Sequence, residues 1–228
     1  MFCHSCGTQV APDVAYCPTC GQSLAAPSPA ALPAFVAPVG IKATPGRWIG
    51  AGWNLVQADL GNTILVSLVF VLLNGVPLIQ GALIAGFHYF FLKKLLGRRA
   101  EFADLFKGFN FFVPTLVASI VIGLFVFGGT LLCIIPGLVI AAIYKFTYLF
   151  VIDKRMDFWP AMQASHAVAK NDYFGFTMFL LLTALVNILG FLCCIVGLLV
   201  SIPVTFAAIT IAYQELVGFD PTTPDRIG

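Results

Sequence analysis

Four cysteines near the start of the chain have the spacing that most clearly indicates chemistry. Cys3 and Cys6 form one CxxC pair, Cys17 and Cys20 form a second, and ten residues separate the pairs. Two such pairs offer four thiolates, which can close a tetrahedral shell around Zn²⁺. A segment this short buries too little apolar surface to fold without a metal or disulfides. We therefore predict that these four cysteines hold a structural zinc ion in residues 1–24.

Disulfide formation and thiol redox chemistry are the alternative uses of a CxxC pair. Residues 1–24 contain no basic stretch followed by an apolar run, so we expect no cleavable signal peptide and a cytosolic N-terminus. Disulfides are disfavoured in the reducing cytosol, and a thioredoxin-like site would need a surrounding βαβ pattern that the sequence lacks. His4 lies inside the first pair. Because four cysteines already complete the shell, we expect His4 to bind no metal.

The head of the chain resembles a known kind of small metal domain. Gly7 and Gly21 directly follow the two cysteine pairs, and the second pair reads CPTCG. Residues 1–24 closely resemble the short zinc ribbons of many bacterial proteins, in which CxxCG, a ten-residue arm and CPxCG follow one another. The resemblance implies a zinc ribbon with the four cysteines as its metal ligands.

Zinc ribbons often contact nucleic acid, but this head is poorly suited to that use. Residues 1–24 contain no Lys or Arg and carry Asp13. Four thiolates around Zn²⁺ add net negative charge, so the head should repel phosphate. We expect the ribbon to bind a protein partner or to have a self-capping role, and we expect nucleic acid not to be a partner.

The composition of the chain is that of a membrane protein. Of the 228 residues, 60% are hydrophobic and 10% are charged, and the mean hydropathy is +0.97. Soluble proteins carry about 25% charged residues, so a soluble surface cannot be built from this sequence. The net charge of +2 is small and its basic residues are spread thinly, which again argues against nucleic acid as a partner.

A segment rich in Ala and Pro follows the ribbon. It contains five prolines and a single charged residue, Lys42. Proline removes helical hydrogen bonds and favours extended polyproline II, so the segment should act as a semi-rigid tether. A spacer of no particular length is the alternative. We predict four parts in the chain: a zinc ribbon in 1–24, a linker in 25–45, a membrane domain in 46–217 and a cytoplasmic tail in 218–228.

Three long apolar stretches make up the predicted membrane domain, at 60–96, 111–152 and 173–217. Each would form a helix of more than about 50 Å, against a hydrocarbon core of about 30 Å, so each must fold back. We predict an all-α membrane protein with six transmembrane helices in three hairpins. The first stretch has short arms and could instead form a re-entrant hairpin. The residues expected to break the stretches are Asn74, Gly75, Pro77, Gly128, Gly129, Pro136, Gly190 and Gly197.

The distribution of basic residues supports this topology. The three hairpin tips carry no charge, whereas basic residues precede, separate and follow the hairpins. Cytoplasmic loops are enriched in Lys and Arg, so we expect both termini on the cytoplasmic side of a bacterial inner membrane. The residues concerned are Lys42, Arg47, Lys93, Lys94, Arg98, Arg99, Lys107, Lys154, Arg155, Lys170 and Arg226.

An amphipathic segment precedes each hairpin, at 48–60, 101–110 and 160–171. We expect interfacial helices at the level of the lipid headgroups, repeated three times with the hairpins. Tryptophan and other aromatic residues collect at that level. The belt residues that we expect are Trp48, Trp53, Phe158 and Trp159.

A second resemblance covers most of residues 46–217. It is carried by the segments ADLFKGF at 103–109, IIPGLVIAAIYKFTYLFVID at 134–153, AMQASHAVAKNDYFGF at 161–176 and LLVSIP at 198–203. These are similar to bacterial six-helix membrane proteins akin to the membrane portion attached to some glycerophosphodiester phosphodiesterases. The resemblance implies a fold and a location. The catalytic domain of those enzymes has no counterpart here, so their activity is not carried over.

Ionisable residues inside the predicted spans are candidates for function. Lys145 lies deep in the second hairpin, and we expect its amine to snorkel toward the interface. His88 lies midway along the second span, where it could pair with another helix, line a polar cavity or relay protons. Glu215 is expected at the headgroups, and Asn74 and Asn187 are expected in turns or interhelical hydrogen bonds.

Three cysteines, Cys133, Cys193 and Cys194, lie near two hairpin tips. A disulfide from Cys133 to either of the other two is sterically conceivable. Cysteine is also a small apolar packing residue, which is the alternative that we favour.

Catalytic motifs are missing from the sequence, which has no GxSxG, no HExxH and no phosphate-cradling glycine loop. We therefore expect no enzymatic activity. A zinc-fixed head on a tether, joined to an apolar bundle among membrane lipids, favours a scaffold or an assembly or regulatory factor whose ribbon binds a protein. The alternative is a component of a small-molecule or lipid transporter or channel, with His88 and Lys145 along its polar route.

Overall fold

The computed structural model describes residues 35, 38, 40 and 42–227. The chain divides into two units, Met1–Phe35 and Val36–Gly228, and the elements below belong to the second unit. The described residues form helices, turns and loops, and no strand occurs among them. The all-α prediction is thereby confirmed for this part of the chain.

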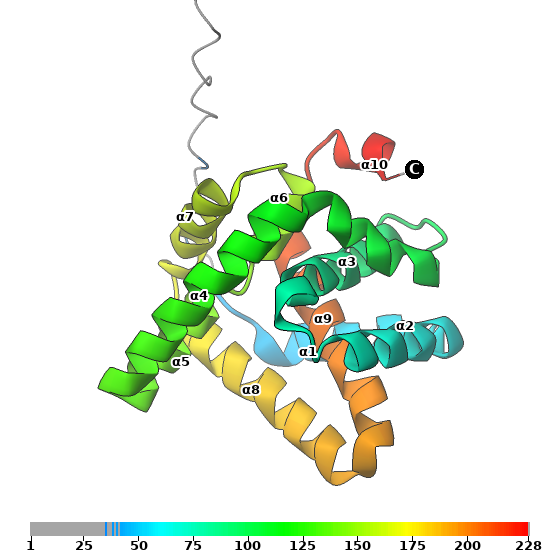
Figure 1. Cartoon of the computed structure of the whole chain (residues 1–228), viewed down its shortest axis with the longest axis horizontal. Coiled ribbons are helices and arrows are strands. Elements are labelled where there is room, and N and C mark those ends of the chain that lie inside the picture. Colours follow the sequence, from blue (N-terminus) through cyan, green and yellow to red (C-terminus); the bar gives the residue numbers. More distant parts are fainter. Residues whose placement is uncertain (1–34, 36–37, 39, 41, 228) are drawn as a thin grey trace, which may run out of the picture. The chain divides into compact units, whose positions relative to one another are not determined.

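The second unit is a succession of helices that fold back on one another (Figure 1). The elements, in chain order, are α1 (Pro45–Gln57), α2 (Leu60–Leu73), α3 (Pro77–Leu95), the 3₁₀ helix η1 (Phe102–Phe111), α4 (Phe112–Leu132), α5 (Ile134–Ile143), α6 (Thr147–Asp153), α7 (Phe158–Ala169), α8 (Tyr173–Leu192), α9 (Cys194–Leu216) and α10 (Thr223–Arg226).

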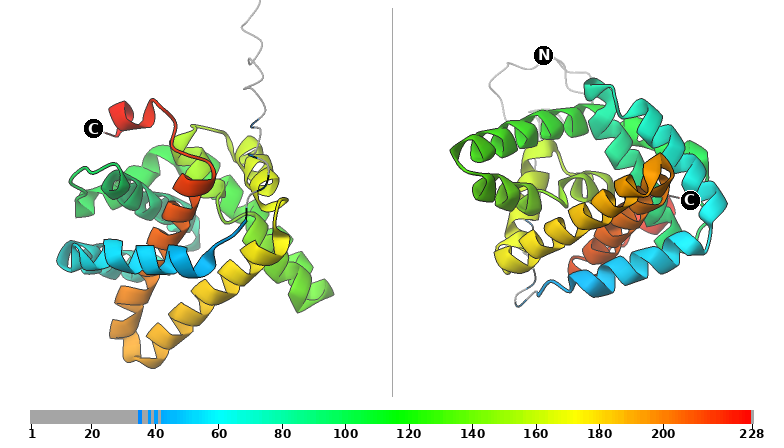
Figure 2. Two further views of the ribbon diagram at one scale, coloured as in Figure 1. Left: turned by 180° about the vertical axis from the view of Figure 1, so that it is seen from behind. Right: turned by 90° about the horizontal axis from the view of Figure 1, so that it is seen from below.

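The tips of two hairpins mark one end of this unit. In Figure 1 the tips of the α4–α5 and α8–α9 hairpins point toward the bottom of the view, whereas α7 and α10 lie near the top, and the view from behind in Figure 2 agrees. The three amphipathic segments predicted ahead of the hairpins are helical and correspond to α1, η1 and α7.

Within the described residues, four helical segments are long and apolar enough to cross a bilayer. They are Phe102–Leu132, Ile134–Asp153, Tyr173–Leu192 and Val196–Leu216. A fifth results if α1 and α2, which meet at an angle of 105°, count as one broken span.

The six predicted spans are therefore not confirmed, and the difference lies in the first hairpin. α2 has 14 residues, or about 21 Å of helix, which is shorter than the hydrocarbon core. α3 has 19 residues but ends in Lys93 and Lys94, and most of its second half is buried by other helices.

The second and third hairpins turn between the residues predicted to break them. The turns lie at Cys133, between α4 and α5, and at Cys193, between α8 and α9. Pro136 lies in the first turn of α5, where proline is tolerated because its missing N–H has no helical partner to lose. The predicted breakers that instead stay inside helices are Gly128, Gly129, Gly190 and Gly197.

Two of these glycines bring the arms of a hairpin together. A Cβ atom on Gly197 in α9 would lie 2.2 Å from the carbonyl oxygen of Gly190 in α8. A Cβ atom on Gly129 in α4 would lie 3.1 Å from Cα of Gly137 in α5. Small residues let helices approach closely, which is the role that these glycines have here.

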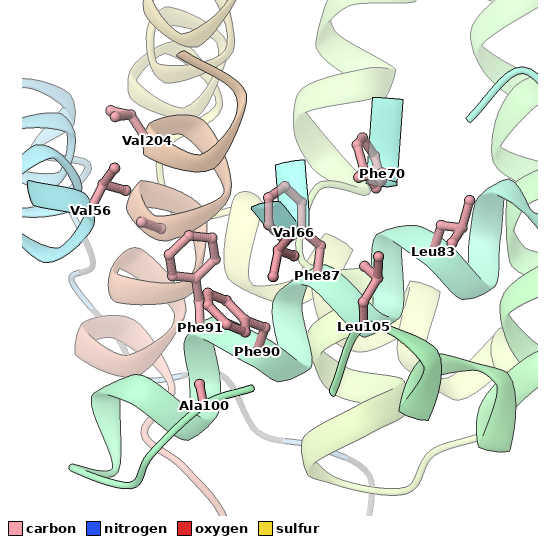
Figure 3. Close-up of a cluster of buried hydrophobic side chains, with 11 residues drawn as sticks. Val56, Val66, Phe70, Leu83, Phe87, Phe90, Phe91, Ala100, Leu105 and Val204 are labelled. Carbon is pink, nitrogen blue, oxygen red and sulfur yellow. The ribbon is translucent and has the colours of Figure 1, made fainter. Parts of the chain in front are cut away.

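α3 is the central helix of the unit. Its buried phenylalanines lie in a hydrophobic cluster to which α1, α2, η1 and α9 also contribute (Figure 3). The cluster comprises Val56, Val66, Phe70, Leu83, Phe87, Phe90, Phe91, Ala100, Leu105, Val204 and Ala207.

α3 and η1 are in backbone contact through a pair of glycines. A Cβ atom on Gly86 would lie 1.7 Å from the carbonyl oxygen of Leu105, and one on Gly108 would lie 2.0 Å from that of Ala82. Contacts this short cannot exist, so both positions require glycine as the helices are packed. This contact fixes η1, and with it the start of α4, against the central helix.

The position of Trp48 differs from the prediction of a headgroup belt. Its side chain is fully buried, its ring centroid lies 5.0 Å from that of Phe179, and its Nε1 donates a hydrogen bond of 2.6 Å to Glu215. Trp48 therefore packs α1 against α8 and α9. Trp53 and Trp159 are exposed, and their place at the headgroups stays a prediction.

Candidate functional site

The predicted zinc ligands lie outside the described residues. These are Cys3, Cys6, Cys17 and Cys20, and they remain a prediction from spacing. In the described part of the chain, no group of three or more His, Cys, Asp or Glu side chains is placed to hold a metal ion. The helical unit offers instead a set of buried polar side chains.

His88 is paired across two helices. Its side chain is 2% exposed, and Nδ1 lies 3.0 Å from the hydroxyl oxygen of Thr210 on α9. That hydroxyl donates its only proton to the carbonyl oxygen of Phe206, at 2.8 Å. The remaining role for the hydroxyl oxygen is that of acceptor, so Nδ1 of His88 carries the proton and donates. His88 therefore ties α3 to α9.

Lys145 lies in the turn between α5 and α6, and its amine points to α8 rather than to the interface. Nζ donates a hydrogen bond of 2.7 Å to the hydroxyl of Thr183 and lies 5.0 Å from the ring centroid of Phe179. The expectation of snorkelling is thus replaced by an interhelical contact.

A second polar contact joins the arms of the last hairpin. Nδ2 of Asn187 on α8 donates to the hydroxyl of Thr205 on α9 at 3.1 Å, as expected for an interhelical hydrogen bond. The side-chain oxygen of Asn187 and the hydroxyl of Ser201 are buried and have no partner among the described residues. Buried polar groups are normally hydrogen bonded, and these two oxygens are among the exceptions in the described part of the chain.

Asp153, at the end of α6, is the most connected polar residue of the unit. It is fully buried and accepts hydrogen bonds from the Tyr213 hydroxyl at 2.8 Å, from the Thr223 hydroxyl at 2.7 Å and from the backbone N–H of Asp220 at 3.0 Å. The guanidinium of Arg226 donates to its backbone carbonyl at 2.9 Å. This carboxylate therefore joins α6 and α9 to the segment after α9.

The C-terminal segment is held in place by this network. Thr223 and Ile227 are buried. Hydrogen bonds from the hydroxyl and backbone N–H of Thr222 lower the pKa of Asp220, so its carboxylate is charged at neutral pH and lies 3.5 Å from the guanidinium of Arg226. The predicted tail in 218–228 is thus a folded element as far as residue 227.

The cysteines near the hairpin tips do not pair in the described residues. Cys133 and Cys193 are free thiols and both are exposed. The disulfide considered from the sequence is therefore not formed by Cys133. Glu215, expected at the headgroups, accepts the indole hydrogen bond of Trp48 and forms an ion pair with Arg47.

Residues 2–24 match the family of zinc-ribbon domains. This match confirms the kind of domain that the cysteine spacing predicts at the N-terminus, and the family suggests zinc binding. The ribbon and the helical unit together define the class of protein: an N-terminal zinc ribbon joined to several apolar helices that could cross a membrane.

Three curated mycobacterial proteins are similar to part of the chain. One is from Mycobacterium bovis and two are from strains of Mycobacterium tuberculosis, with 27%, 27% and 29% identity over 122 residues. Each match covers 54% of this chain and 37% of the relative, so the matched part is little more than a third of those proteins. All three are called uncharacterized proteins. No solved structure matches the chain.

These relatives leave the link to the membrane portion of glycerophosphodiester phosphodiesterases a resemblance only. Sequence reasoning did not find the Asp153 network, because Asp153 precedes two basic residues and resembles an ordinary helix end. The partners in its hydrogen bonds lie at least 60 residues away in the sequence. The only available signal was a carboxylate directly at the end of an apolar run.

Proposed function

We propose that this protein is a membrane-anchored adaptor: the helical unit holds the chain in a bacterial inner membrane, and the zinc ribbon binds a protein partner on the cytoplasmic side. The observation that carries the proposal is the union of a zinc-ribbon domain at residues 2–24 with helices able to cross a membrane. The ribbon lacks Lys and Arg and carries Asp13, which favours a protein surface over a nucleic acid.

The contacts inside the helical unit support this proposal over transport. A transport route would draw on His88 and Lys145, two ionisable side chains that lie between packed helices. His88 bonds to Thr210 and Lys145 bonds to Thr183, so each joins two packed segments. Such bonds are the usual role of polar side chains between membrane helices. We therefore assign both residues to the stability of the anchor.

The topology that we propose follows from the same helices. The α4–α5 and α8–α9 tips face the outside, and the basic loops, the ribbon and the C-terminal segment face the cytosol. The ribbon then lies in a reducing compartment, where thiolates bind zinc and do not form disulfides.

Co-purification of the full-length protein in mild detergent tests the adaptor role. The double variant Cys3→Ser, Cys6→Ser removes two of four predicted ligands, so we expect it to lose its zinc. We also expect the amount of partner protein that co-purifies to fall at least about tenfold below that of the wild type. Zinc is measured by atomic absorption and the partners by mass spectrometry.

The matched control is Cys133→Ser, Cys193→Ser, which removes two free thiols of the helical unit. It should keep both the zinc and the partners. An unchanged partner set in the zinc-free ribbon variant would contradict the adaptor role, whatever its effect on metal content.

A further inference from the structure

A cavity with a cationic rim lies where α2 begins, beside the loop from α3 to η1. Its volume of about 660 Å³ is in the range of small-molecule sites. Its lining contains three basic and two acidic residues, which leaves net positive charge. The lining residues are Asp59, Gly61, Asn62, Leu65, Lys94, Arg98, Arg99, Ala100, Glu101 and Phe102.

Only some of these charged side chains form ion pairs or hydrogen bonds within the protein. Nζ of Lys94 lies 3.2 Å from the carboxylate of Asp59 and donates to the Thr63 hydroxyl at 3.0 Å. Glu101 takes part in the capping box that begins η1. The side chains of Arg98 and Arg99, by contrast, have no hydrogen bond or ion pair with any residue that the structure describes. Two guanidinium groups therefore line the cavity without an acidic side chain bonded to them.

The loop that carries the two arginines is fixed at both ends. Gly97 ends α3 with a φ of +71°, and the N–H groups of Gly97 and Arg98 close the helix end on the carbonyls of Lys94 and Lys93. At the other end, Nδ2 of Asn62 donates a hydrogen bond of 2.7 Å to the carbonyl of Ala100. The backbone that carries the two arginines is therefore held in one conformation. Less conformational entropy is then lost when an anion binds.

The apolar surroundings indicate what kind of anion fits. Leu65 and Phe102 line the cavity and are exposed. From Leu65 an exposed apolar stripe continues along α2 through Leu68 and Leu72, at helical spacing and over about 10 Å. An anionic group between the arginines would therefore have an apolar surface running away from it on one side, which is the arrangement of a lipid phosphate and its acyl chains.

We propose that this cavity binds the phosphate of an anionic phospholipid, with Arg98 and Arg99 as its ligands and an acyl chain along Leu65, Leu68 and Leu72. Guanidinium groups bind phosphate through paired hydrogen bonds, and basic pockets at the cytoplasmic ends of membrane helices bind anionic headgroups. This inference goes beyond the adaptor role and does not depend on the zinc ribbon.

Native mass spectrometry of the delipidated full-length protein tests the proposal. The protein is offered an equimolar mixture of phosphatidylglycerol and phosphatidylcholine in detergent. We expect the wild type to retain phosphatidylglycerol selectively, and Arg98→Gln, Arg99→Gln to weaken its binding at least about tenfold. Because neither side chain has a described partner, the thermal unfolding midpoint without lipid should stay unchanged, which the same samples show.

The matched control is Lys42→Gln, Lys170→Gln, which removes the same charge at two exposed positions. It should bind phosphatidylglycerol as the wild type does, and Arg98→Lys, Arg99→Lys should recover part of the binding. Equal loss in the control, or full retention in the arginine variant, would overturn the site. Displacement of the lipid by millimolar inorganic phosphate would overturn the lipid assignment and identify a free phosphate as the ligand.

Discussion

Gly86→Ala is expected to disrupt the packing of α3 on η1. The added Cβ atom would lie 1.7 Å from the carbonyl oxygen of Leu105, so one backbone must move away from the other. Inserting atoms into a packed core already destabilises proteins by about 1–3 kcal/mol, and here no flexible side chain can yield. We expect a loss of stability at or above the top of that range, seen as a lower thermal midpoint and less monodisperse protein in detergent.

Gly123→Ala is the control for this prediction. Gly123 lies in α4, is exposed, and a Cβ atom there would have no atom within 4 Å. The substitution should leave stability unchanged or raise it slightly, since alanine favours helices more than glycine does. Equal stability of the Gly86 and Gly123 variants would show that η1 does not rest on α3 as described.

Asp153→Ala is expected to release the C-terminal segment. The substitution removes the acceptor for the hydroxyls of Tyr213 and Thr223 and for the N–H of Asp220, and it leaves the buried Tyr213 hydroxyl without this partner. Losing hydrogen bonds to a buried carboxylate should lower stability by about 3 kcal/mol. Hydrogen exchange followed by mass spectrometry should show faster exchange in residues 218–227, whereas α4 and α8 keep their protection.

The control removes a carboxylate from the segment itself. Asp225 is exposed and has no described side-chain partner, so Asp225→Ala should leave exchange in residues 218–227 as in the wild type. Slow exchange in that segment of the Asp153 variant would mean that Thr223 and Ile227 hold it without the carboxylate.

The local features of the helical unit could be predicted from the sequence. Apolar runs at 111–152 and 173–217 are longer than a bilayer is thick, and they do form helices that turn back. The amphipathic patterns also identified α1, η1 and α7, because helical periodicity is a local signal. The spacing of four cysteines identified the ribbon, which the family match at residues 2–24 confirms.

Contacts between distant segments could not be predicted in the same way. The sequence around Trp48 predicts a tryptophan at the headgroups. In the structure its side chain contacts Phe179 and Glu215, which lie more than 100 residues later in the chain. The interior pairing of Lys145 with Thr183 depends on the approach of α8 to the turn after α5. Gly129, Gly190 and Gly197, predicted to break helices, instead lie between packed arms, because glycine alone does not say whether a helix ends or a neighbour approaches.

The topology is the claim on which the adaptor proposal depends most directly. In intact cells, a membrane-impermeant maleimide should label native Cys133, at the α4–α5 tip, and should leave Ser28→Cys, which marks the linker beside the ribbon, unlabelled until the membrane is permeabilised. Peptide mapping by mass spectrometry separates the two positions. Labelling of Ser28→Cys in intact cells, with Cys133 protected, would place the ribbon outside and contradict a reduced zinc site that binds a cytosolic partner.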